Sequence, residues 1–228
     1  MTDEPHPSLL DPAAQAVLDR LHGLAKTQFR SMIGHYLPML PSMLLGRPAP
    51  STKDMSYFDD KLLALNAAQG DLLYLLARTK GVRCAVEFGT SFGVSTIYLA
   101  AGVRDGGAGG RVIGTELVAA KAAKARANLA EAGLADYVNI REGDARETLR
   151  SLGEPVDLLL LDGWPALGIE VLRIVEPQLS DGAIVMVDNV AQFRADLRSV
   201  LERLSRAPYR SAMLPFRSGT LVGVYGGA

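Results

Sequence analysis

The sequence predicts an α/β protein with a doubly wound, mostly parallel sheet, N-terminal helices and an antiparallel C-terminal hairpin. From about Gly81 onward, short runs rich in leucine and β-branched residues alternate with longer helical stretches, which is the pattern of βαβ units. Residues 158–161 are four consecutive leucines, as expected for a parallel strand covered on both faces. Two further strand-like runs near the C-terminus are separated only by RSG, a gap that fits a hairpin and not a helix.

Helices are expected before the sheet. The first begins with Asp11 as its N-cap and Pro12 at the first helical position, where a missing N–H costs little. The segment 58–81 predicts one or two more helices, and residues 37–56, with four prolines, predict a loop between these helices. Residues 1–55 are therefore expected to form a helical lid or a dimerisation segment.

Within the sheet, the clearest helix is residues 118–133. It is rich in alanine, lysine and leucine, which favour helix, and Gly133 is placed as its C-cap. The expected strands are residues 83–89, 111–116, 137–143, 156–163 and 183–189, followed by the hairpin strands 209–216 and 220–227.

Composition excludes several classes of protein. The chain carries 24 basic and 25 acidic residues, so no basic excess indicates a nucleic-acid or anionic-membrane partner. The single cysteine, Cys84, excludes an internal disulfide and a cysteine-built zinc site. The N-terminus lacks the basic start and apolar core of a signal peptide, and the apolar stretch 36–46 is too short to span a bilayer. A cytoplasmic protein is expected.

The first strand leads into a glycine loop, VEFGTSFGVST. Gly89 and Gly93 flank a tight turn into a helix that starts near Val94, which lets a ligand approach the backbone. The spacing is G-x-x-x-G, not the G-x-G-x-x-G of dinucleotide sites. Glu87, two residues before the first glycine, suits a ligand with a cationic amine better than a pyrophosphate. An ordinary strand–turn–helix corner is the alternative.

Acidic residues also end the next two strands. Glu116 ends the second strand, where in this architecture an acid accepts hydrogen bonds from ribose hydroxyls, although it could also be a solvated acid or a helix cap. After the third strand, Asp144 or Ala145 is expected beside an adenine. An aspartate before a helix is equally a good N-cap.

The motifs VEFGTSFGVS, GTE, EGDA, LLLLDGW and VMVDNV occur in this order. Together they resemble the class I S-adenosylmethionine-dependent methyltransferases, and more closely the metal-dependent O-methyltransferases of the catechol and caffeoyl-CoA type, including small bacterial members. The resemblance covers roughly residues 60–228, so residues 56–228 are expected to be the methyltransferase domain. It implies a Rossmann-like, seven-stranded sheet with an antiparallel last strand.

The resemblance also implies a role for each motif residue. S-adenosylmethionine (SAM) would be the cofactor, its ribose would be held by Glu116, and its adenine would be flanked by Asp144 and Ala145. Trp164 stands where some members place a tryptophan against the adenine; a partly buried core aromatic is the alternative. The residues expected around the methionine part of SAM are Glu87, Gly89, Ser91, Gly93 and Ser95, with Asp162 also near the cofactor and in catalysis.

Asp162 ends the fourth strand, and Asp188 with Asn189 ends the fifth. Neighbouring parallel strands deliver their C-terminal ends to one edge, so two carboxylates and an amide oxygen should converge. Oxygen ligands suit Mg²⁺, the expected ion, or Ca²⁺ or Mn²⁺. A cation chelating two neighbouring acceptor oxygens would fix their geometry and lower the hydroxyl pKa, which predicts a vicinal-diol or catechol-like acceptor. Two aspartates that merely cap loops are the alternative.

The acceptor half of the family pattern is altered. Catechol-type members commonly carry a lysine base three residues after the first metal aspartate, and here that position is Pro165. The segment 215–220, PFRSGT, lacks the acid that such members carry near the acceptor. Three interpretations stay open: a metal-dependent O-methyltransferase with another base or none, a methyltransferase that uses no metal or acts on another atom, and a cofactor-binding protein without transfer. A homodimer and a small-molecule acceptor are the expected partners, and the candidates for a replacement base are His22, His35, Lys53 and Lys61.

Overall fold

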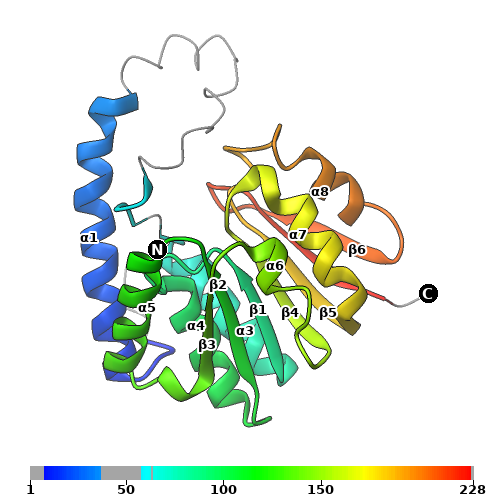
Figure 1. Ribbon diagram of the computed structural model, residues 1–228, viewed down its shortest axis with the longest axis horizontal. Helices are drawn as coiled ribbons and strands as arrows, with labels where there is room; N and C mark the ends of the chain where they lie inside the picture. The colour runs from blue at the N-terminus through cyan, green and yellow to red at the C-terminus, as the bar shows by residue number, and fades with distance from the viewer. Residues whose placement is uncertain (1–7, 37–57, 63, 227–228) are drawn as a thin grey trace, which may run out of the picture.

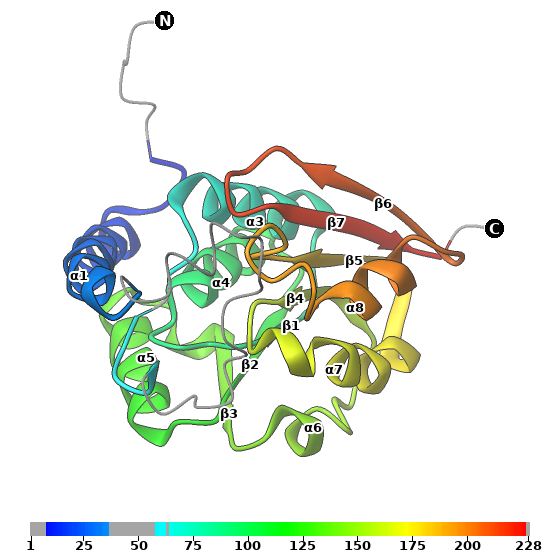
Figure 2. The same cartoon turned by 90° about the horizontal axis from the view of Figure 1, so that it is seen from above.

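The seven-stranded sheet predicted from the sequence is present in the computed structural model, which describes residues 8–36, 58–62 and 64–226. The strand order is β3-β2-β1-β4-β5-β7-β6, and Figure 2 shows it from β3 at one edge to β6 at the other. β7 runs in the direction opposite to that of the other six strands. The strands are β1 Cys84–Phe88, β2 Arg111–Glu116, β3 Val138–Glu142, β4 Val156–Leu161, β5 Leu179–Val187, β6 Tyr209–Leu214 and β7 Thr220–Tyr225.

Helices cover both faces of the sheet (Figure 1). One face carries α1 Pro12–Tyr36, α3 Ala67–Lys80, α4 Val94–Gly106 and α5 Ala119–Glu131, and the other carries α6 Ala145–Thr148, α7 Gly168–Val175 and α8 Arg198–Leu204. Short 3₁₀ turns are η3 Ala135–Tyr137, η4 Pro165–Leu167 and η5 Glu176–Gln178.

The leucine run of β4 is buried on both sides. Leu158 and Leu160 belong to the core beneath α1, α3, α4 and α5, whereas Leu159 and Leu161 belong to the core beneath α6, α7 and α8. Successive side chains of a strand point to opposite faces. The unbroken apolar run is therefore explained by a hydrophobic core on each face of the sheet, as the sequence predicted.

Most predicted boundaries agree with the structure to within one or two residues, but β5 was predicted too short. It begins at Leu179 and not at residue 183. The added segment, LSDG, is polar and ends in Gly182, whose φ is +72°, so it carries no strand pattern. Pairing of Leu179 with Val156 brings it into the sheet, with a register irregularity before Leu158.

The first helix begins as predicted. Asp11 caps α1 through Oδ1, which accepts from the backbone N–H groups of Ala13 and Ala14 at 3.0 Å. Its first turns contribute to the sheet core, with Leu18 and Leu21 fully buried. The assignment of residues 1–55 as a lid or dimerisation segment stays a prediction, and the loop predicted at 37–56 lies outside the described residues.

Backbone hydrogen bonds hold the C-terminal ends of β1, β4 and β5 side by side. The N–H of Asp162 donates to the Phe88 carbonyl at 3.0 Å, and that of Asp188 donates to the Leu161 carbonyl at 3.2 Å. At Gly89 the φ is +100°, and a Cβ there would lie 2.5 Å from the Cα of Gly163. Glycine is therefore required where the loop after β1 passes the end of β4.

Close packing of α3 on α4 fixes the helix that reaches this edge. A Cβ at Gly70 would lie 2.3 Å from the Tyr98 ring, and a Cβ at Gly102 would lie 2.6 Å from the Tyr74 carbonyl oxygen and 2.8 Å from the Ala77 Cβ. The two glycines let the helix axes approach, and this brings the N-terminus of α3 to the strand ends.

No helix in the described parts of the chain is long and apolar enough to cross a bilayer.

Two glycine substitutions should change stability in opposite directions. Gly102→Ala is expected to lower the free energy of unfolding by about 1–3 kcal/mol, because the methyl group overpacks the α3–α4 contact. Gly23→Ala, inside α1, is expected to raise it by about 0.5–1 kcal/mol, since a Cβ there meets nothing within 4 Å. Urea denaturation of the two variants measures both effects, and a change of the same sign in both would contradict the packing argument.

Candidate active site

Glu87 is the most deeply buried of the predicted site residues, with a relative exposure of 0%. Its Oε2 accepts hydrogen bonds from the hydroxyls of Thr90, at 2.9 Å, and Thr96. Its Oε1 is buried and has no hydrogen-bond partner among the described residues. One acceptor of this carboxylate is therefore unused in a place where an unsatisfied polar atom is costly.

Burial raises the pKa of Glu87, the surrounding hydroxyls oppose this, and the charge of Glu116 adds to it. A glycine makes room for the arrangement: a Cβ at Gly114 on β2 would lie 2.3 Å from Thr90 Oγ1 and 3.5 Å from Glu87 Oε2. Because a cation beside the carboxylate would stabilise its charged form, the site suits a ligand with an ammonium group.

Glu116 ties the glycine loop to the end of β2. Its Oε2 accepts from the N–H of Ser91 at 2.8 Å, and its Oε1 accepts from the N–H of Val118 at 2.9 Å. Each carboxylate oxygen has a second lone pair that can accept from a ligand hydroxyl. Ser91 adopts a φ of 51°, and its buried hydroxyl finds no partner in the described structure. Gly93 caps α4 at a φ of 90°, so the predicted loop residues surround one turn.

Asp144 is the N-cap of α6, as its alternative interpretation proposed. Its Oδ1 accepts from the N–H of Arg146 at 2.8 Å, and its carboxylate also pairs with the Arg146 guanidinium at 2.6 Å. Ala145 is buried and begins the helix. Helix geometry leaves the N–H of this first residue without an intrahelical acceptor, so it can donate to a ligand.

Trp164 follows β4 and is half-buried. It packs against the core beneath α6, α7 and α8, and its ring centroid lies 6.2 Å from that of Phe58 at an interplanar angle of 49°. Phe58 comes from the segment before α3, more than a hundred residues earlier in the chain. Phe58 therefore contacts Trp164, which lies two residues after Asp162 in the chain.

The predicted strand-end ligands come together. Asn189 has a φ of 59°, and its Nδ2 donates to Asp162 Oδ1 at 3.0 Å. Burial raises the pKa of Asp162 well above its usual value, and the negative charges of Asp188 and Glu87 raise it further, opposed by the Asn189 hydrogen bond. Two carboxylates, of which Asp188 is buried, thus lie close enough to repel one another.

Asp188 is held by a network that the sequence did not reveal. Its Oδ1 accepts from Gln69 Nε2, from Ser218 Oγ at 3.1 Å and from Thr220 Oγ1 at 3.2 Å. Burial raises the pKa of Asp188, and the backbone N–H of Asn189 and these three side-chain donors oppose the rise. The three donors are polar side chains of unremarkable local pattern, so no sequence signal identified them.

Among the described residues, no group of three or more His, Cys, Asp or Glu side chains could hold a metal ion. A cation at this edge would therefore depend on two carboxylates, the amide of Asn189 and oxygens from outside the protein.

Candidates for a replacement base are only partly described. Pro165 begins the η4 turn and supplies no proton-accepting group. His22 lies on α1, where burial lowers its pKa and Lys26 adds to the effect, opposed by Asp19 and Asp71. Lys61 pairs with Asp60 at 2.6 Å. Lys53 and the side chain of His35 lie outside the described part of the chain, so the choice of base stays a prediction.

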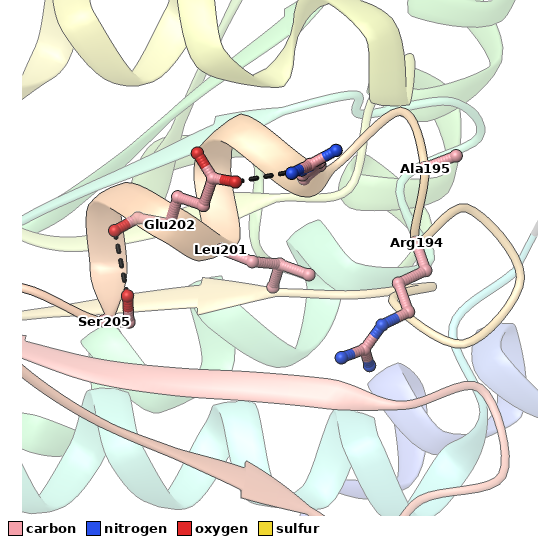
Figure 3. Close-up of a pocket in the computed structure, with 6 residues that line it drawn as sticks. Arg194, Ala195, Leu201, Glu202 and Ser205 are labelled. Atoms are coloured by element: carbon pink, nitrogen blue, oxygen red, sulfur yellow. Dashed lines mark hydrogen bonds and ion pairs between the residues drawn. The ribbon is translucent and has the colours of Figure 1, made fainter.

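A hollow along α8 and the loop before it is separate from these residues. Figure 3 shows Glu202 and Ser205 on the helix and Arg194 on the loop. None of the described site residues lines this hollow, so it is not part of the candidate active site.

Comparison with known proteins identifies methyltransferases as relatives of this chain. A methyltransferase domain family matches residues 86–190. A catechol O-methyltransferase from Mycobacterium tuberculosis is 39% identical over 129 residues, 56% of this chain and 57% of the relative. One from Niastella koreensis is 32% identical over 158 residues, 60% of this chain and 68% of the relative.

A solved structure agrees as well. The O-methyltransferase TomG from Streptomyces achromogenes, determined in complex with SAM, matches with a TM-score of 0.66 and 30% identity over 75% of this chain and 86% of that one. The match to the M. tuberculosis relative spans little more than half of that protein's length. The glycine loop and the strand-end acids lie within the matched residues 86–190, and the chain belongs to the class I O-methyltransferases.

Proposed function

We propose that the protein transfers a methyl group from SAM to a hydroxyl oxygen of a small, catechol-like acceptor bound to a divalent cation. The observation that carries the proposal is the meeting, at one sheet edge, of the Glu87 loop with Asp162, Asp188 and Asn189. A cofactor loop and a set of oxygen ligands on neighbouring strand ends are the two parts that such a reaction needs.

The residues present fit SAM. The unpartnered Oε1 of Glu87 can accept from the ammonium group of its methionine part, and the unpartnered hydroxyl of Ser91 can bond to the same part. Glu116 can accept from the ribose hydroxyls. The N–H of Ala145 can donate to the adenine, with Asp144 and Trp164 beside it. The sulfonium of SAM supplies an activated methyl group.

The residues also fit a divalent cation. The negative charge of Asp188 raises the pKa of Asp162, a repulsion that a cation between the two carboxylates would relieve. Mg²⁺ is commonly bound by one or two carboxylates with waters and substrate oxygens completing its shell, so two aspartates and Asn189 are a sufficient set. Mg²⁺ is the proposed ion, with Ca²⁺ or Mn²⁺ as alternatives. Such an ion acts as a Lewis acid that lowers the pKa of a bound hydroxyl.

Phe58 supports an aromatic acceptor. Its ring lies 6.2 Å from that of Trp164, the residue proposed to lie beside the adenine, and offers a flat apolar surface. A planar catechol ring could pack against the Phe58 ring while its two oxygens reach the cation. The protein's part in catalysis is then to orient the acceptor and exclude water.

Pro165 keeps two other functions open: a metal-independent methyltransferase, and a cofactor-binding protein that transfers nothing. Both follow from the missing lysine base of catechol-type relatives. We further propose a cytoplasmic homodimer without nucleic-acid or membrane partners, in keeping with the balanced charge of 24 basic and 25 acidic residues.

Glu116→Ala is expected to weaken SAM binding by about 1–3 kcal/mol, because it removes charged hydrogen bonds to the ribose. Isothermal titration calorimetry measures the change. Glu147→Ala is the matched control, since the Glu147 carboxylate pairs with Arg150 on the surface and its loss should leave SAM affinity unchanged. Heat with NAD but none with SAM or its demethylated product would contradict the cofactor assignment.

Transfer to a catechol should depend on a divalent cation. Excess EDTA is expected to abolish methylation, and added Mg²⁺ should restore it. Asp188→Ala should abolish the metal-stimulated rate while leaving SAM affinity nearly unchanged, because this carboxylate is proposed to contact the cation. Methylation is followed with radiolabelled SAM and affinity by calorimetry. Full activity in EDTA would show that Asp162 and Asp188 only cap their strands.

Pro165→Lys is expected to raise the rate on simple catechols, because it restores a base where relatives carry one; general bases contribute about 10²–10⁴-fold. Pro165→Ala is the control for relaxing the backbone. The turnover number at saturating SAM compares the two variants. Equal rates would mean that a side chain at this position does not reach the acceptor, which leaves the cation requirement untouched.

A further inference from the structure

Gln69 connects two distant parts of the molecule. It lies in the first turn of α3, has a relative exposure of 1%, and is separated from Asp188 by 119 residues. Its Nε2 donates to Asp188 Oδ1 and lies within hydrogen-bond distance of Ser218 Oγ, at 2.9 Å, and Thr220 Oγ1, at 2.6 Å. The amide nitrogen of Gln69 therefore lies among three oxygen atoms, one of which belongs to a carboxylate.

The oxygen and the nitrogen of the Gln69 amide make different contacts. Gln69 Oε1 accepts from Asn66, and Asn66 Oδ1 accepts from the N–H of Gln69 at 3.0 Å, which forms a capping box at the start of α3. A capping box needs the backbone N–H and the side-chain oxygen of this position. It does not need the amide nitrogen, so helix capping leaves the contact with Asp188 unexplained.

The hydrogen bonds that the three side chains donate to Asp188 all end on one of its two carboxylate oxygens. Gln69, Ser218 and Thr220 all donate to Oδ1, and a carboxylate oxygen offers about two lone pairs. Oδ1 is therefore fully engaged, and none of the three side chains donates to Oδ2. A carboxylate without such partners rotates easily about its last torsion, since that torsion has a broad profile.

We propose that Gln69 is a positioning residue that holds Asp188 with Oδ1 bound and Oδ2 presented to the divalent cation. The inference rests on the proposed function, since it takes Asp188 as a cation ligand. Groups that hydrogen-bond to a metal ligand orient it, and their loss typically costs about 10–100-fold in metal affinity. Because Gln69 also closes the cap with Asn66, one side chain links the start of α3 to the geometry of the proposed cation site.

The test measures Mn²⁺ binding to the full-length protein by electron paramagnetic resonance. Gln69→Met has a similar size and no donor, and it is expected to weaken Mn²⁺ binding about 10–100-fold with SAM affinity unchanged by calorimetry. Gln178→Met is the matched control. Gln178 is also partly buried and hydrogen-bonded, but to the backbone of Leu149, Leu152 and Ile174 beside the start of β5, so its loss should not change Mn²⁺ binding.

The outcomes separate the inference from the proposed function. Equal Mn²⁺ affinity in wild type and a folded Gln69→Met variant overturns the role of Gln69 alone. No Mn²⁺ binding by the wild-type protein overturns the cation site and this inference together. Should Gln69→Met not fold, Gln69→Asn decides the question: it keeps an amide that is one methylene too short to reach Asp188, so undiminished Mn²⁺ affinity in that variant overturns the inference as well.

Discussion

The candidate site depends on one constraint: the C-terminal ends of β1, β4 and β5 are joined by backbone hydrogen bonds and cannot separate. The bonds from Asp162 to Phe88 and from Asp188 to Leu161 continue the sheet past its regular strands. They place the side chains of Glu87, Asp162 and Asp188 at one edge of the sheet despite the repulsion between their negative charges. Glycine at position 89 lets the first loop pass within contact of the fourth strand, so the cofactor loop and the proposed cation ligands share one space.

Burial and mutual repulsion disfavour the charged forms of these carboxyl groups, and the surrounding hydrogen-bond donors offset this only in part. Glu87 accepts from two hydroxyls, and Asp188 accepts from an amide and two hydroxyls, yet burial still raises the pKa of both. The Asn189 amide opposes the rise at Asp162, whose pKa still lies well above its usual value. Polar donors stabilise a buried carboxylate but do not neutralise it. An edge built this way is complementary to cations, which is why a sulfonium cofactor with an ammonium group and a divalent ion suit it together.

The acceptor side is organised by the segment that precedes α3 as much as by the sheet. Phe58 meets Trp164 at the end of β4, and Gln69 meets Asp188 at the end of β5. Gly70 on α3 and Gly102 on α4 let these two helices pack closely, and this packing keeps α3 in place. Position 165 is a proline, which has no proton-accepting side chain, and the loop between β6 and β7 supplies the Ser218 hydroxyl that donates to Asp188. Chemistry on the acceptor therefore rests on positioning and on the proposed cation.

Much of this arrangement could be predicted from the sequence because it is local. The leucine run, the glycine loop and the acid after each strand are short patterns, and parallel topology alone brings Asp162 and Asp188 to one edge. The polar start of β5 at Leu179 was missed, since strand pairing and not hydrophobic pattern places it in the sheet. Gln69, Phe58, Ser218 and Thr220 were missed for a related reason. Each is an ordinary residue locally, and its partner lies far away in the chain, 119 residues away in the case of Gln69. Only the folded packing of α3 and the β6–β7 loop against the strand ends decides which donors surround a buried carboxylate.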